Sequence, residues 1–108
     1  MLRLMSLFAA MGLVAVLAVA AKAGGQAAQI SIDNFAFSPA SLVAPVGATV
    51  EWVNNDDSPH KVVADDHTTF SSKALDTGDH YAFTFTRAGV YSYFCSIHPK
   101  MVAKVVVK

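Results

Sequence analysis

Residues 90–104 read V-Y-S-Y-F-C-S-I-H-P-K-M-V-A-K and contain the only cysteine of the 108-residue chain, Cys95. The residues before the cysteine alternate in polarity, which places Tyr91, Tyr93 and Cys95 on one face of a predicted strand. That face belongs to the core, because the opposite face would bury only a serine and a phenylalanine. The sequence therefore predicts a thiol that points inward at the end of a buried strand.

The loop after the thiol carries two more potential metal ligands, since His98 and Met101 follow Cys95 at steps of three residues. A tight turn there can return the imidazole to the sulfur, with the thioether close behind. A lone cysteine or methionine is more often a core residue than a ligand. Together, thiolate, imidazole and thioether form a soft set that selects copper, whereas zinc makes no use of methionine.

A copper site of the His₂Cys type needs a second histidine. Outside the loop the chain offers His60, His67 and His80. His60 follows a proline and opens a β-branched run, so we predict that it lies at a strand end and binds the metal. His67 lies in an irregular loop, and His80 precedes the inward-facing Tyr81. We expect both of these histidines on the surface.

The rest of the chain also has the pattern of strands, and no segment has a helical period long enough to compete. Residues 65–79 are expected to form an irregular loop with at most one helical turn. Pro45 favours an edge position for its strand. We predict an all-β fold, a Greek-key β-sandwich or barrel of seven to eight strands. The expected strands are 29–37, 41–46, 49–54, 60–64, 80–86, 90–95 and 102–108.

The amino-terminal segment has the layout of a secretory signal peptide. An uncharged run covers residues 4–21, and Ala21-Lys22-Ala23 forms an A-x-A cleavage site. The run is also just long enough to span a bilayer, so a membrane anchor is the alternative. We expect residues 1–23 to be cleaved, which leaves one domain, residues 24–108, in the periplasm and outside the membrane.

Charge and cysteine content limit the possible functions of the cleaved chain. It holds six Lys and Arg against eight Asp and Glu, without a basic run, so nucleic acid is not an expected partner. An odd thiol in an exported protein implies an intermolecular disulfide, a reactive thiol or a metal. The acidic pairs Asp56-Asp57 and Asp65-Asp66 are expected to be solvated loop residues.

These motifs resemble the cupredoxins, the small blue copper proteins, over residues 30–108. The short spacing of Cys, His and Met is similar to that of the amicyanin branch of the family. The segments that carry the resemblance are His60, C-x-x-H-x-x-M (95–101), G-V-Y-S-Y-F (89–94), V-E-W-V-N (50–54), F-T-F-T-R-A-G (83–89) and K-V-V-V (104–107).

The resemblance implies one copper ion, cycling between Cu(I) and Cu(II), with His60, Cys95, His98 and Met101 as its ligands. It implies a monomer that is not an enzyme and that shuttles single electrons. The partners would be a c-type cytochrome or a periplasmic dehydrogenase, docking transiently near His98. A copper-delivery protein with the same ligands is the alternative. An enzyme with Cys95 as nucleophile and His98 as base is a third reading, which a buried thiol disfavours.

The chain departs from the family pattern directly after the first predicted ligand. The family usually has an asparagine there, whose side chain ties the two ligand loops together, and this chain has Lys61. We expect the backbone N–H of Lys61 still to reach the Cys95 sulfur. Because such outer ties tune metal sites, the reduction potential does not follow from the resemblance.

Overall fold

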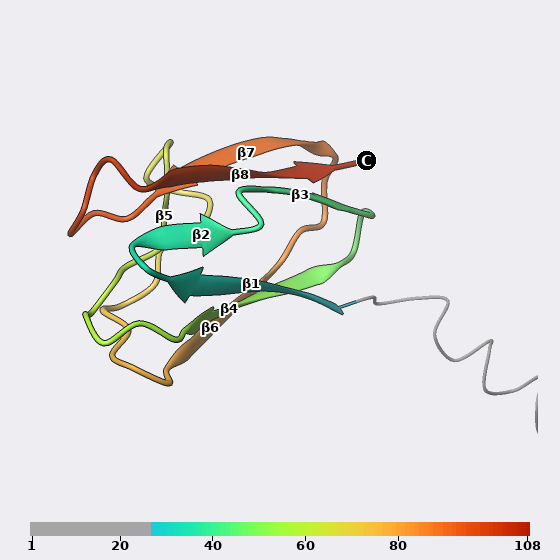
Figure 1. The fold of residues 1–108 in the computed structure, drawn as a ribbon. Helices are drawn as coiled ribbons and strands as arrows, with labels where there is room; N and C mark the ends of the chain where they lie inside the picture. The colour runs from blue at the N-terminus through green and yellow to red at the C-terminus, as the bar shows by residue number, and fades with distance from the viewer. Residues whose placement is uncertain (1–26) are drawn as a thin grey trace, which may run out of the picture.

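The computed structural model describes residues 27–108, which form two four-stranded sheets packed face to face (Figure 1). One sheet has the order β2-β1-β4-β6 and the other β3-β8-β7-β5. The chain changes sheet between β2 and β3 and at each connection up to β7, so the fold is an all-β sandwich. The strands are β1 (Ala27–Asp33), β2 (Ala36–Ser38), β3 (Ser41–Ala44), β4 (Thr49–Asn54), β5 (Val63–Ala64), β6 (His80–Thr84), β7 (Gly89–Phe94) and β8 (Val102–Val107).

The core lies between the sheets and is built by residues that alternate along each strand. In β4, Val50 and Trp52 are fully buried, as the period-two pattern predicts. Tyr93 of β7 lies edge-on to Trp52 across the sandwich, with ring centroids 5.4 Å apart. Phe70 packs against the same two rings, although it belongs to the segment expected to be a loop. This aromatic centre supports the end of β7, from which Cys95 follows.

Three connections meet at one end of the sandwich, opposite the C-terminus (Figure 1). They are the β1–β2 turn, the segment after β4, and the β7–β8 loop at residues 95–101. The strands that carry them belong to both sheets, so the folded sandwich holds together segments that are far apart in sequence. This end of the molecule contains the predicted ligands.

The structure confirms the sandwich and most of the predicted strands, with one correction that concerns the site. Residues 29–37 were predicted as a single strand, but a two-residue turn at Asn34 and Phe35 divides them into β1 and β2. Both turn residues have positive φ, 52° and 56°. A bulky residue with positive φ is rare, which is why the alternation of apolar residues concealed this turn.

The irregular segment 65–79 contains bends and isolated bridges, and no helical turn is assigned within it. Phe70 and Leu75 are buried there, so the segment contributes to the core. β3 lies at the edge of its sheet, as the nearby Pro45 predicts. No helix in the part of the chain described here is long and apolar enough to span a membrane. The predicted signal peptide, residues 1–23, lies outside the described residues.

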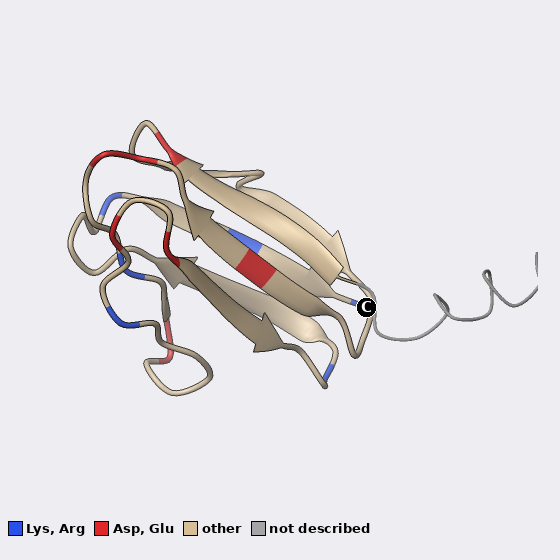
Figure 2. Cartoon of the chain, turned by 90° about the horizontal axis from the view of Figure 1, so that it is seen from below, with Lys and Arg blue, Asp and Glu red and all other residues tan. Residues whose placement is uncertain are grey.

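Charged residues occur mainly in the loops, and few lie in the strands (Figure 2). Glu51 in β4 and Lys104 in β8 are the charged residues within strand interiors. Acidic and basic loop segments both occur at the end that holds the predicted ligands (Figure 2). Among residues 27–108 the Lys and Arg residues stand singly in the sequence, without the basic run that is typical of a nucleic-acid-binding segment.

Candidate metal centre

His60 is fixed by a backbone bridge just before β5. Its N–H donates to the Leu75 carbonyl at 3.0 Å, and its own carbonyl accepts the Leu75 N–H at 2.7 Å. The ring of the preceding Pro59 fixes that residue's own φ, which limits how the chain enters His60. The side chain is fully buried, so the ring is delivered into the interior at a defined place.

The loop of residues 95–101 is closed by its own backbone. Cys95 N–H donates to the Met101 carbonyl at 3.0 Å, and Met101 N–H donates to the His98 carbonyl at 2.9 Å. The His98 N–H completes the turn by donating to the Cys95 carbonyl at 3.1 Å. Three predicted ligands are therefore held by one compact turn. Cys95 is fully buried, as the alternation of β7 predicts.

The structure brings a sulfur and two ring nitrogens together. Nδ1 of His60 lies 3.7 Å from the Cys95 Sγ, and Nδ1 of His98 lies 3.8 Å from it. Together with the thiol, both histidines form the one cluster among residues 27–108 whose donor atoms all lie within 4.8 Å of one another. These separations would allow Cys95, His60 and His98 to bind one metal ion together, as the three donors of a His₂Cys copper site would.

Asp56 holds the outer nitrogen of the His60 ring. Its Oδ2 lies 2.9 Å from His60 Nε2 and also accepts the Phe35 N–H at 2.9 Å. An ionised carboxylate can only accept, so the His60 proton belongs on Nε2 and the lone pair on Nδ1 faces the sulfur. The backbone donor of Phe35 and the His60 ring lower the pKa of Asp56, which keeps the carboxylate ionised. This is the usual outer partner of a metal-binding histidine.

Asp56 is itself well fixed, so it is a firm support for that ring. Its N–H donates to Asn54 Oδ1 at 2.9 Å, and its carbonyl accepts the Thr77 hydroxyl at 2.6 Å. Asn54 is fully buried and donates from Nδ2 to the carbonyls of Ser58 and Leu75. The segment before His60 is thus shaped by a buried polar network. Our prediction that Asp56 is a solvated loop residue is wrong, because its side chain serves this network.

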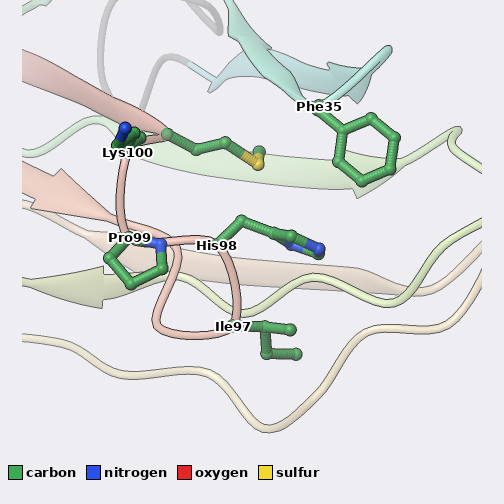
Figure 3. A pocket seen from close by; sticks show the side chains of 6 residues that line it. Phe35, Ile97, His98, Pro99 and Lys100 are labelled. Carbon is green, nitrogen blue, oxygen red and sulfur yellow. The ribbon is translucent and has the colours of Figure 1, made fainter.

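Met101, the fourth predicted ligand, is 7% exposed and belongs to the core. It lines an open pocket of about 520 Å³ together with Phe35, Ile97, His98, Pro99 and Lys100 (Figure 3). In this close view, His98 and Phe35 point into the same space from different segments of the chain. His98 is only partly buried, so its ring connects the buried sulfur with the surface. The pocket is largely apolar at this point.

The expected contact from Lys61 is present. The Lys61 N–H donates to Cys95 Sγ at 3.4 Å, within the range of hydrogen bonds to sulfur. A backbone donor does not depend on the side chain, which explains why this tie persists without the family asparagine. The predictions for the other two histidines are also confirmed. His67 is exposed against the Phe94 ring, and His80 pairs with Glu51 on the surface.

Sequence reasoning missed two residues beside the centre, Asp56 and Phe35. Phe35 lies edge-on to His60 and to His98, with ring centroids 5.4 and 5.0 Å apart. Asp56 stands four residues before His60, and that spacing alone does not distinguish it from Asp57. Phe35 is remote from every ligand in sequence, so no local signal could have identified it.

Comparisons with known proteins agree with the fold and with copper as the cofactor. The model of the cupredoxin-like domain matches residues 5–107. Amicyanin of Paracoccus versutus is 34% identical over 95 residues, which cover 82% of this chain and 70% of the relative. Plastocyanin of Synechococcus is 36% identical over 100 residues, covering 80% and 70%. The structure of a purple cupredoxin from Nitrosopumilus maritimus aligns with a TM-score of 0.70 at 38% identity, covering 75% of this chain and 99% of that one.

The two-sheet sandwich and the sulfur–imidazole cluster define a small copper protein of the electron-transfer class. The chain belongs to the cupredoxin family, and amicyanin is among its relatives. Its cofactor is one copper ion, and the donors present fit that ion in type and in spacing.

Proposed function

We propose that this protein carries single electrons between redox partners in the periplasm and is not an enzyme. In this proposal His60, Cys95, His98 and Met101 hold the copper. The observation that carries the proposal is the buried Cys95 thiol with two imidazole nitrogens at 3.7 and 3.8 Å. Copper bound there supplies a one-electron couple between Cu(I) and Cu(II).

The surroundings of the donors favour electron transfer over chemistry on a substrate. Four protein donors leave no open position at the metal, unlike catalytic sites, which keep one. The short loop is closed by its own hydrogen bonds, and Pro99 restricts the conformations of His98. A site that moves little between oxidation states reorganises little. The complete burial of Cys95 also argues against its use as a nucleophile.

The exposed part of the centre suggests where a redox partner would dock. His98 lies beside Phe35 and Ile97, which are 48% and 43% exposed. An apolar surface around a partly exposed ligand suits a brief encounter, in which the partner approaches the ring without strong charge pairing. We propose a c-type cytochrome or a periplasmic dehydrogenase as partner, and a monomeric carrier.

Export is the second part of the proposal. Residues 1–23 act as the signal peptide and are removed after Ala23, which leaves residues 24–108 as the mature protein. Expression of the full chain in a Gram-negative host tests this directly. Mass spectrometry of the periplasmic fraction should find a chain that begins at Gly24. Full-length protein retained in the membrane would support the anchor instead and would contradict the proposed cleavage.

The carrier function is tested by copper titration of the mature chain. We expect one ion per chain, an intense visible absorption from thiolate-to-Cu(II) charge transfer, and reversible one-electron voltammetry. The copper-delivery alternative predicts release of the metal to a chelator within seconds and a poorly reversible voltammogram. Either of those two results, or a colourless Cu(II) form, would rule out the carrier.

A further inference from the structure

The turn between β1 and β2 has an unusual conformation for its sequence. Asn34 and Phe35 both have positive φ, and this two-residue turn favours Asn followed by Gly. Asparagine tolerates the left-handed region, but phenylalanine is strained there. The Phe35 ring is also 48% exposed, so burial in the core does not account for it. Strained residues of this kind are retained where the surrounding structure or the function requires them.

The contacts of the Phe35 ring give a reason for that strain. The ring lies edge-on to His98 at 5.0 Å and 80°, and edge-on to His60 at 5.4 Å and 82°. Both arrangements are favourable for aromatic pairs. His60 and His98 lie 5.0 Å from each other, so the three rings form one cluster with Phe35 on the outside.

The two histidines differ in how they are held. Nε2 of His60 is fixed by Asp56, and the ring is fully buried. Within residues 27–108 the structure records no hydrogen bond to Nε2 of His98, and this ring is partly exposed. Its orientation therefore depends on what packs against it. On the outer side, that neighbour is Phe35.

We propose that Phe35 is a positioning residue that holds the His98 ring toward Cys95 and slows its departure from the metal. This inference rests on the proposed copper site and adds the β1–β2 turn to it as a third segment. Asp56 anchors the turn, because the same Oδ2 accepts the Phe35 N–H and lies against His60 Nε2. The Asp56 carboxylate thus fixes His60 directly, and it also fixes Phe35, which covers the partly exposed His98.

Three variants of the mature chain test this role. Phe35→Gly removes the ring and relieves the strained φ, so the domain is expected to remain at least as well folded. Asn34→Gly is the matched control, because it relaxes the same turn and keeps the ring. Phe35→Tyr keeps the aromatic edge and should rescue the property that Phe35→Gly loses.

Two measurements are compared across these variants. The first is NMR relaxation of the His98 ring in the metal-free protein, where we expect greater ring motion only in Phe35→Gly. The second is the rate at which Cu(I) passes to a chelator such as bicinchoninate. The loss of one edge-on aromatic contact predicts about three- to tenfold faster release in Phe35→Gly. Asn34→Gly and Phe35→Tyr should remain near the wild-type rate.

The outcomes separate this inference from the proposed function. Equal ring motion and equal release rates in Phe35→Gly and Asn34→Gly would overturn the role of Phe35. If the wild-type chain binds no copper, the proposed function fails. Ring relaxation in the metal-free protein then still decides whether Phe35 restrains His98.

Discussion

Replacing Cys95 by serine should remove the copper chemistry and leave the sandwich folded. The side chain is fully buried, and its sulfur accepts the Lys61 N–H at 3.4 Å. A serine hydroxyl can accept the same bond, so the donor keeps a partner. Burial of a hydroxyl in place of a thiol should lower the free energy of unfolding of the metal-free protein by about 1–2 kcal/mol.

The difference in stability between the wild type and Cys95→Ser should be far larger in the presence of copper. At a free copper concentration 100 times the dissociation constant, binding stabilises the wild-type domain by about 2.7 kcal/mol. For a domain of this size that corresponds to a rise in Tm of about 10–20 °C. If serine weakens binding 100-fold, the gain at the same copper concentration falls to about 0.4 kcal/mol, or a shift of about 3 °C or less.

Thermal unfolding followed by circular dichroism is measured with and without Cu(II) for the wild type and Cys95→Ser. It gives the stability of the metal-free protein and the additional stabilisation by copper. Visible absorption of the same samples reports the thiolate–copper bond. Ser96→Ala is the matched control, since it alters the neighbouring exposed residue of the same loop and should behave as wild type. A variant with serine at position 95 that retains the full thermal shift, or the intense absorption, would refute the ligand assignment.

Three further predictions concern the axial ligand, an exposed carboxylate and the surface. Met101→Leu removes the thioether and places a side chain of similar volume at this core position. It should raise the reduction potential measured by voltammetry, by roughly 60 mV for a tenfold change in relative Cu(I) affinity. A potential that stays within error of wild type would contradict an axial role for Met101. Hydrogen bonds from Thr69, above all from its hydroxyl, lower the pKa of Asp66 from 3.8 to about 2. The stability from this carboxylate is complete above about pH 4 and is lost as the pH falls toward 2. In Asp66→Asn, the free energy of unfolding from urea titrations should therefore fall less steeply over this acid range. An unchanged dependence on pH would contradict this contribution of Asp66. Ile97→Asp should slow electron self-exchange, measured by NMR line broadening, by about tenfold without moving the potential, because the charge disrupts the apolar approach to His98; unchanged exchange would place docking elsewhere.

The parts of this protein that follow from local patterns could be predicted from the sequence. Period-two alternation identified the inward face of β7 and therefore the burial of Cys95. The Cys-x-x-His spacing gave the loop that returns His98 to the sulfur, and Pro59 marked His60 as a strand-end residue. In each case the relevant contact lies within a few residues, or follows from which face of a strand is buried.

The parts that could not be predicted depend on contacts between segments that are distant in sequence. Phe35 meets His98 only because β1 and β7 lie in opposite sheets and end on the same side of the sandwich. Asp56 differs from its neighbour Asp57 only in the partners that the folded chain presents to it. Because Phe35 occupies a turn position that favours glycine, the sequence pattern predicts that the strand continues there. The contacts that account for its strained backbone are formed only in the folded protein.

The departure at Lys61 illustrates how the same support can be supplied by other residues. The family asparagine would link the two ligand loops through its side chain. In this protein the link from residue 61 is the hydrogen bond from the Lys61 backbone N–H to the Cys95 sulfur. The remaining support comes from the other side of the centre, where Asp56 fixes His60 and anchors the turn that carries Phe35. Asp56 and the β1–β2 turn together therefore contact both histidines from that side. Since outer partners tune the metal they surround, the potential of this protein should respond more to changes at Asp56 and Phe35 than to the side chain at position 61.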